Sequence, residues 1–541
     1  MSETAQRRGI EAPRVAVPAA LERRWFPFGI VAVMAVAAAF LLHQLYAWQP
    51  HEDETLALFV GRQPLGGLLE TVLEERGGAP LHFLFAWAVA HLGFGLGGLR
   101  VVSVVFAIAS LPLVALLGRR LAGRREGLVA SVLVAASWMF LFHAVYGRMY
   151  SLFLLTSALS YLVFLRALDR GGGRAWAAWV AAVMLTVATH PYGALVLASQ
   201  GAYLVLARRD RLHDAVVPFA AVGVLGLPFW LSTLVLAGRF DVGVGGGGAK
   251  LGSPLSVLEY LWHVAGAFSA GWLPVTFLVL GVAALGLLRL PRATVALTAC
   301  VVGVPTLAFL AARLGSSASP ETRHLIFALP FFAIAVAAGL LRLGRVAPVA
   351  LAALVVAQVA WAWERTPPLF EWEPDVRQAA RAEASTYLAA TSRPADVLFG
   401  YEPLYLGAWE RNPDFPLAVL PRADAKLALA TLLDLERPLG RGIWVFDASD
   451  NNNFTQRLTI PLRSPEPASA FQVRRFGPFL VIRTREPVAT PARYLERAGQ
   501  AMLVGKRLFM GDADVNLVTV ERAARELRGY GAARSLSTSS R

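Results

Sequence analysis

Cysteine is almost absent from the 541-residue chain, and charged residues are scarce. The single cysteine, Cys300, lies inside an apolar stretch with no second thiol to pair with, which excludes a disulfide framework and a thiolate metal site. Charged residues make up 16% of the chain, against about 25% in an ordinary soluble protein. A soluble globular protein is therefore not the expected class.

Several local signatures of enzyme chemistry are also missing. The chain has no helix-borne zinc motif, no Gly-Lys-Ser phosphate-binding loop and no Gly-x-Ser-x-Gly nucleophile turn. No internal repeat is evident, whereas many transporters are built from inverted repeats.

Apolar residues, in contrast, make up 56% of the chain and gather into long runs. Runs of about 18 or more residues with almost no charge are the length that a helix needs to cross hydrocarbon. They recur up to residue 364 and predict a polytopic α-helical membrane protein with about 11 to 13 transmembrane helices. The predicted spans are 29–48, 80–98, 100–118, 127–146, 150–166, 175–190, 193–207, 215–236, 272–288, 293–312, 325–341 and 346–363.

The net charge of +14 has a simple explanation in the placement of the arginines. Nineteen of them lie in the N-terminus, residues 1–28, and in every second loop between spans, whereas the other loops hold seven basic residues. Because basic loops stay in the cytoplasm, the N-terminus is predicted to be cytoplasmic and residues 49–79 to form the first outer loop. The charge thus indicates membrane orientation and no nucleic-acid partner.

One pair of spans leaves the topology open. If 80–98 and 100–118 both cross the membrane, the arginines at 119–125 fall on the outer side. Either one of the two runs is re-entrant, which gives eleven crossings, or this cluster breaks the rule. Eleven crossings are favoured.

The composition changes after Trp363, and residues 365–541 are predicted to form a soluble α/β domain. Short apolar runs at 396–399, 442–446 and 479–482 suit strands, and amphipathic stretches near 375–390, 490–503 and 514–528 suit helices. The orientation rule predicts that this domain is extracytoplasmic. Polar groups at 401–403 and 447–450 could bind an acceptor there, or could be ordinary loop residues at strand ends.

The first outer loop contains the run His51-Glu52-Asp53-Glu54 directly after the first span. A carboxylate at the membrane boundary can accept a proton from a substrate hydroxyl or amine, and it can also help to hold a divalent cation. The alternative is structural, because carboxylates suit the first turn of a helix.

Three further groups fall at outer span ends: Arg148 beside Tyr150, His190 with Tyr192, and Arg323 with His324. An arginine there can hold a phosphate through its planar fork, or it can simply anchor the span at the interface. The coincidence of basic sites and one acidic cluster on the same side favours a site. A lipid phosphate next to a general base needs that combination.

The order of these motifs resembles the polyprenyl-phosphate-sugar-dependent glycosyltransferases of the GT-C class, family 39. That family holds the protein O-mannosyltransferases and the aminoarabinose transferases of lipid A. The resemblance covers roughly residues 29–345 and implies a GT-C-like transmembrane domain over 29–364. The matching segments are Asp53-Glu54, Gly78-Ala79-Pro80-Leu81-His82-Phe83, Arg148-Met149-Tyr150, His190-Pro191-Tyr192 and Arg323-His324-Leu325 followed by Pro330.

The resemblance also implies roles. Asp53 would activate the acceptor and Glu54 would support the site, while Arg148, Arg323 and His324 would hold the donor phosphate. The substrate would further contact four outer residues, and the sugar would pass by inverting displacement at the anomeric carbon. These four residues are His51, Tyr150, His190 and Tyr192.

The leading hypothesis is a glycosyltransferase of a bacterial plasma membrane. It would move a sugar from a polyprenyl-phosphate donor to a cell-envelope acceptor, which is a glycan, a lipid or a protein. The sequence assigns no cofactor, and it leaves a divalent cation at the acidic loop open. The alternative is a transporter or flippase of lipid-linked saccharides, and a polysaccharide polymerase or ligase would share the chemistry but differ in its acceptor.

Overall fold

The computed structural model describes residues 19–47, 50–75, 78–239, 253–311, 321–370, 376–400, 404, 406–407, 418–421, 431–435, 438–447 and 470–508. The long apolar runs form helices, since a helix satisfies its backbone hydrogen bonds within its own segment, as hydrocarbon requires. These helices are α1 (Ala19–His43), α5 (Leu96–Leu121), α6 (Arg124–Ala136), α7 (Trp138–Val145), α8 (Tyr150–Arg170), α9 (Gly173–Thr189), α10 (Gly193–Ala207), α11 (Leu212–Leu225), α12 (Leu227–Arg239), α13 (Pro254–Phe268), α14 (Leu273–Leu287), α15 (Arg292–Ala311), α16 (Leu329–Leu340) and α17 (Ala347–Arg365).

The described residues confirm a polytopic helical membrane protein. Five helices are long and apolar enough to cross a membrane, and three bent helix pairs raise that number to eight. Two shorter apolar helices, α9 and α10, add to these, and the longest apolar run, Thr322–Arg365, is broken at Gly344 between α16 and α17. Gly344 has a φ of 59°, which suits glycine in a chain reversal. By length and composition, the described residues therefore hold five to eight membrane-crossing helices, and eleven crossings stays a prediction.

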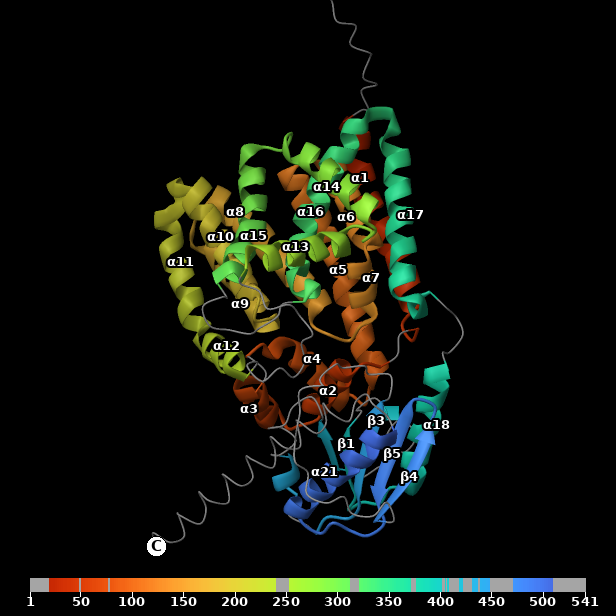
Figure 1. The fold of residues 1–541 in the computed structure, drawn as a ribbon. Helices are drawn as coiled ribbons and strands as arrows, with labels where there is room; N and C mark the ends of the chain where they lie inside the picture. The colour runs from red at the N-terminus through yellow and green to blue at the C-terminus, as the bar shows by residue number, and fades with distance from the viewer. Residues whose placement is uncertain are drawn as a thin grey trace, which may run out of the picture.

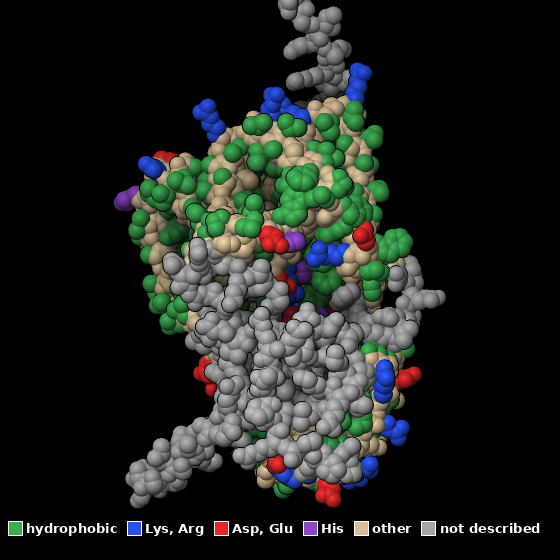
Figure 2. Space-filling view, in the orientation of Figure 1, with side chains coloured by type: hydrophobic (Ala, Val, Ile, Leu, Met, Phe, Trp, Pro, Cys, Tyr) green, Lys and Arg blue, Asp and Glu red, His purple; other side chains and the backbone are tan. Residues whose placement is uncertain are grey.

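The short helix α4 (Pro80–His91) resolves the ambiguity of the residues between 80 and 118. Its 12 residues span about 18 Å at 1.5 Å per residue, well short of a hydrocarbon core about 30 Å thick. The next helix, α5, has 26 residues and is long and apolar enough to cross by itself. The arginines at 119–125 then lie on the same side as the other basic loops, and Figure 2 shows Lys and Arg side chains along the top of the helical part.

Short helices form a layer at the opposite end of the bundle. In Figure 1, α2 (Glu52–Gly61), α3 (Leu65–Glu75) and α4 lie below the long helices, where the first outer loop was predicted. Three 3₁₀ segments, η4 (Thr322–Ala328), η5 (Leu341–Val346) and η6 (Pro367–Leu369), flank α16 and follow α17, and η1 (Arg209–Arg211) precedes α11. The break between α6 and α7, a bend of 58°, directs the chain toward this layer.

The C-terminal region forms the predicted α/β domain. Its sheet has the order β2-β1-β3-β5-β4, with β1 parallel to β2 and β3, and β5 antiparallel to both β3 and β4. One face packs on α18 and the other on α21, so the domain has three layers. Its elements are α18 (Val376–Thr391), β1 (Val397–Gly400), β2 (Ala418–Pro421), β3 (Gly442–Asp447), β4 (Phe471–Phe476), β5 (Phe479–Thr484) and α21 (Pro491–Leu508). The predicted helix at 514–528 lies outside the described residues.

This domain rests on the layer of short helices (Figure 1). Phe59 of α2 packs against the core between α18 and the sheet, and Leu406 joins the core of the short-helix layer. The domain therefore lies on the same side of the bundle as the acidic loop.

Candidate active site

The acidic run starts a helix, and that start leaves one carboxylate free for other contacts. His51 caps α2: its Nδ1 accepts a hydrogen bond from the Asp53 backbone N–H at 3.2 Å, while its own N–H donates to Glu54 Oε2 at 2.9 Å. The structural alternative considered for this run is thus correct for the backbone. The side chain of Asp53 takes no part in the cap.

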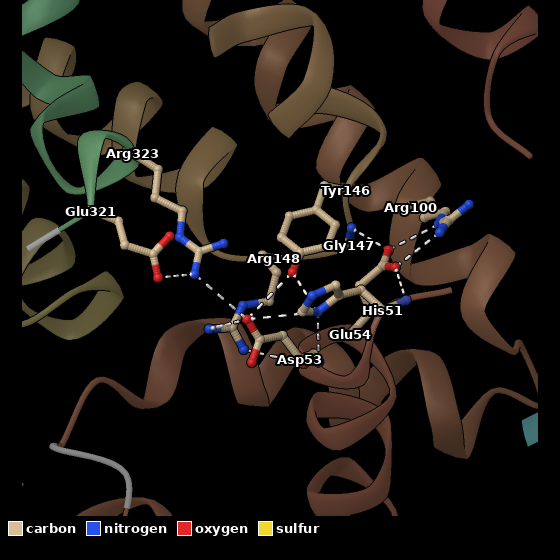
Figure 3. Close-up of polar contacts among 9 residues, drawn as sticks. All are labelled: His51, Asp53, Glu54, Arg100, Tyr146, Gly147, Arg148, Glu321 and Arg323. Atoms are coloured by element: carbon tan, nitrogen blue, oxygen red, sulfur yellow. Dashed lines mark hydrogen bonds and ion pairs between the residues drawn. The ribbon is translucent and has the colours of Figure 1, made fainter. Parts of the chain in front are cut away.

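Glu54 is fully buried and is surrounded by donors. Arg100 donates from Nε to Oε1 and from Nη2 to Oε2, both at 2.9 Å, and the Gly147 N–H donates to Oε1 at 2.7 Å. Arg100 also donates to the carbonyl of Leu45 at 3.1 Å. Glu54 therefore joins α2 to α5 and to the loop between α7 and α8, and its carboxylate has no side open to a substrate (Figure 3).

Asp53 faces two arginines that come from distant parts of the chain (Figure 3). Its Oδ2 lies 3.5 Å from Arg148 Nη2, in the loop before α8, and 3.9 Å from Arg323 Nη2, in η4. The side chain is 27% exposed, whereas Arg148 and Arg323 are 14% and 19% exposed. The structure thus brings together three residues that the sequence analysis placed on the outer side.

Two neutral groups complete the surroundings of Asp53. These groups are Tyr146 and His51: the Tyr146 hydroxyl donates to Asp53 Oδ2 at 3.3 Å or to His51 Nδ1 at 2.9 Å. In addition, Arg148 Nη1 donates to the Asp53 carbonyl at 3.1 Å. Burial opposes ionisation of the Asp53 carboxyl, yet Arg148, His51 and Arg323 hold its pKa well below the usual range. Burial lowers the pKa of His51, so its imidazole is neutral near pH 7.

The arginines keep donor capacity beyond the carboxylate. Arg323 also pairs with Glu321 Oε1 at 2.7 Å, and its guanidinium lies 5.2 Å above the ring of Tyr150. The Nε atoms of both Arg148 and Arg323 are buried without a hydrogen-bond partner among the described residues. Two cations with unused donors beside a carboxylate suit an anionic ligand such as a phosphate.

Four predicted residues gather on the far side of Arg323. The ring of His324 lies 5.2 Å from His190 and 4.9 Å from Tyr192, and Tyr150 lies 5.8 Å from His190. We call Tyr150, His190, Tyr192 and His324 the histidine box. The box is continuous with the arginines through the stacking of Arg323 on Tyr150.

Sequence reasoning did not assign roles to three buried residues nearby. Arg100 was hidden in an apolar span, where a charged residue by itself signals a buried partner. His143, in α7, lies 4.7 Å from Tyr150, and neither of its ring nitrogens has a partner in the described part of the chain. His82, in α4, also has an unpartnered Nε2, and burial, with a contribution from Arg148, lowers its pKa to about 3.

The residues at the acidic loop do not fit a divalent cation. Both oxygens of Glu54 accept from Arg100, and Asp53 Oδ2 faces two guanidinium groups. Within the described ranges, no three His, Cys, Asp or Glu side chains gather in a way that could hold a metal ion. The polar groups suggested in the C-terminal domain, 401–403 and 448–450, lie outside the described residues, as does the side chain of Asp447.

Comparisons with known proteins agree with this architecture. A family model described as dolichyl-phosphate-mannose-protein mannosyltransferase matches residues 77–235. The crystal structure of ArnT from Cupriavidus metallidurans bound to undecaprenyl phosphate is similar at 13% identity and a TM-score of 0.52, over 84% of this chain and 97% of that chain. Its apo state is similar at 14% identity and a TM-score of 0.52, over 86% and 98% of the two chains. No curated protein sequence matches significantly.

Proposed function

We propose that this chain, a membrane glycosyltransferase of the GT-C class, transfers a sugar from a polyprenyl-phosphate donor to an extracytoplasmic acceptor. The observation that carries the proposal is the partly exposed Asp53 carboxylate between Arg148 and Arg323. A base and a phosphate site must lie side by side for such a transfer. ArnT, which has the same fold, has been solved with undecaprenyl phosphate.

The two arginines would hold the donor phosphate. Their unpartnered Nε atoms can donate to phosphate oxygens in addition to the Nη atoms. The phosphate carries one negative charge as the sugar phosphodiester and gains a second when it leaves as polyprenyl phosphate. Cations that bind the second charge more tightly than the first stabilise the transition state more than the ground state.

Asp53 would accept the proton of the acceptor hydroxyl or amine. The acceptor atom attacks the anomeric carbon, the bond from that carbon to the phosphate oxygen breaks, and the electron pair leaves with the phosphate. Attack opposite the leaving phosphate inverts the anomeric centre. Because Arg148 and Arg323 also pair with Asp53, a bound phosphate would draw them away from it. The pKa of Asp53 would rise toward its usual range, and the carboxylate would become a better base when the donor is present.

Glu54 and His51 would be positioning residues. Glu54 ties α2 to Arg100 and Gly147, and His51 caps the helix and orients Tyr146 toward Asp53. Asp53 is therefore held by groups that do not themselves meet the acceptor.

The reaction would take place outside the cytoplasm. The acidic loop and the α/β domain share the face opposite the basic loops, and basic loops remain in the cytoplasm. In a bacterium this is the outer face of the plasma membrane, where the C-terminal domain can meet a cell-envelope acceptor.

The proposal is tested with the full-length protein in liposomes that contain a radiolabelled undecaprenyl-phosphate sugar. Incubation with cell-envelope extract is expected to move label into the acceptor and to release undecaprenyl phosphate. Movement of the intact lipid between leaflets, with no release of the carrier, would instead identify the alternative function, a flippase.

Removal of either phosphate cation should slow transfer strongly. Arg148→Gln and Arg323→Gln are each expected to lower kcat by about 100-fold, because a lost donor to a developing oxyanion typically removes that much. A matched control is Arg209→Gln, an exposed arginine of η1 whose Nε donates to the Val205 carbonyl. Unchanged kcat in both site variants would contradict the assignment of the phosphate site.

Removal of divalent cations should leave transfer almost unchanged. Both oxygens of Glu54 are occupied and Asp53 is neutralised by guanidinium groups, so neither offers a cation a free pair of ligands. The rate in excess EDTA is expected to stay within about two-fold of the untreated rate, since the positive charge at the phosphate comes from arginine. A loss restored by added Mg²⁺ or Mn²⁺ would contradict this view.

A further inference from the structure

The histidine box begins where the phosphate site ends. Arg323 stacks on Tyr150, and Tyr150 lies 5.8 Å from His190 and 6.1 Å from His324. In a polyprenyl-phosphate donor the sugar is bonded directly to the phosphate. If the proposed function holds, a phosphate held by Arg323 therefore places its sugar next to the histidine box.

In both histidines of the box, Nδ1 accepts a backbone hydrogen bond and Nε2 remains for other contacts. His190 Nδ1 accepts from the Tyr192 N–H at 3.0 Å, and His324 Nδ1 accepts from the Glu321 N–H at 3.0 Å. A neutral imidazole whose Nδ1 is an acceptor carries its proton on Nε2. Neither Nε2 has a hydrogen-bond partner among the described residues, so each ring keeps one unused N–H donor.

These unused donors border a buried cluster, where water or a ligand can satisfy them. His190 is 4% exposed, and His143, next to Tyr150, is 2% exposed with both ring nitrogens unpartnered. Buried polar groups are normally paired, because an unpaired one costs about 1–3 kcal/mol. A sugar ring supplies hydroxyl oxygens that accept from such N–H donors.

The charge around the box further restricts the sugar. The two described carboxylates that face this region, Asp53 and Glu321, are both paired with Arg323. The Arg323 guanidinium already places a positive charge against the Tyr150 ring of the box, so a further positive charge is disfavoured there. An ammonium group on the sugar would meet N–H donors and guanidinium groups instead of an acceptor.

We propose that Tyr150, His190, Tyr192 and His324 form the sugar subsite of the donor, and that this subsite accepts a neutral, hydroxylated sugar and rejects one with a free amino group. The sequence resemblance includes both mannosyltransferases, which use a neutral sugar, and aminoarabinose transferases. The box favours the neutral sugar. Neutral imidazole and phenol groups can hydrogen-bond to sugar hydroxyls on either face of the sugar ring.

The experiment measures binding of lipids to the full-length protein in nanodiscs. The probes are bare undecaprenyl phosphate and two matched pairs of undecaprenyl-phosphate sugars, arabinose with 4-amino-4-deoxyarabinose and glucose with glucosamine. In the pair that binds more tightly, the neutral member is expected to bind at least about ten-fold better than the amino member, the effect of one unpaired buried charge or donor.

Variants separate the sugar subsite from the phosphate site. His190→Ala and His324→Ala are each expected to weaken the neutral sugar lipid about ten-fold and to change bare undecaprenyl phosphate by less than about two-fold. His324→Gln, which can still accept from the Glu321 N–H and donate an N–H, should recover most of the loss. The control is His263→Ala, an exposed histidine of α13 that lies outside the box.

Three results would overturn the inference. An amino sugar bound as tightly as its neutral partner would exclude the proposed selectivity. Equal losses for bare carrier and sugar lipid in the histidine variants would move these residues to the phosphate site, and no loss for either would make them packing residues. Failure of the wild type to bind even bare undecaprenyl phosphate would instead count against the proposed function.

Discussion

Asp53→Asn is expected to lower the rate of sugar transfer by about a thousand-fold or more, within the range for removal of a general base. Asparagine has nearly the same shape and can still accept from Tyr146, Arg148 and Arg323, so the surroundings of the side chain are kept. What it cannot do is take a proton at neutral pH. The measurement is kcat with saturating donor in proteoliposomes.

The matched control for this variant is Glu321→Gln. Glu321 also pairs with Arg323, but its side chain is 46% exposed and does not face Tyr146 or His51. Loss of an exposed ion pair is worth less than about 1 kcal/mol, so kcat should fall by less than about five-fold. Bare undecaprenyl phosphate should bind to Asp53→Asn at least as tightly as to wild type, because a negative charge beside the phosphate is gone. Full activity of Asp53→Asn would remove this residue from the mechanism.

The pH dependence follows from the lowered pKa of Asp53. A carboxyl whose pKa lies below its usual value of 3.8 stays ionised from pH 7 down to pH 5. The pKa of His51 is lowered too, so its imidazole is neutral above pH 6.5. As the pH falls below 6.5, it gains a proton less readily than a free histidine. We expect kcat/KM for the acceptor to show no acid limb between pH 5 and pH 7, and an acid limb near pH 6.5 would contradict this assignment.

The helical part of the fold could be predicted from composition because hydrocarbon leaves the backbone few choices. Long apolar runs at 100–118, 150–166 and 293–312 became helices close to the predicted bounds. The helix in the run 80–98 is shorter than the run for a physical reason: the run is as apolar as a span, but its helix ends at His91 in a Gly-containing turn. Hydropathy measures burial and cannot distinguish a short helix in an outer layer from one in the membrane.

The candidate site was predictable where its residues fall at span ends. Asp53, Arg148, Arg323 and the residues of the histidine box were all expected at the outer level, and Figure 3 shows the first three facing one another. What could not be predicted is how the two carboxylates divide their roles. Asp53 and Glu54 are neighbours in the sequence, but Asp53 faces Arg148 and Arg323 whereas Glu54 faces Arg100. The reason is that α2 starts here and successive helical side chains lie about 100° apart.

The buried pair of Arg100 and Glu54 leads to the second large effect. Arg100→Leu removes both guanidinium bonds and leaves a fully buried carboxylate with only two backbone N–H donors, from Gly147 and His51. Removal of one partner of such a pair typically destabilises by about 3–5 kcal/mol. We expect the free energy of unfolding, followed by denaturant titration in detergent, to fall by about that amount, and transfer to fall with it because α2 loses its link to α5.

A second variant separates the buried charge from the lost packing. In Arg100→Leu/Glu54→Gln the carboxylate is neutral, so no unpaired charge is left in the interior, and the amide can still accept from Gly147 N–H. This double variant should recover more than half of the lost stability, while transfer stays low because Asp53 is still displaced. Arg148→Leu is the matched control and should cost less than Arg100→Leu, because Asp53 is partly exposed and keeps Arg323 as a partner. Equal stability of Arg100→Leu and Arg148→Leu would mean that Glu54 does not organise this loop.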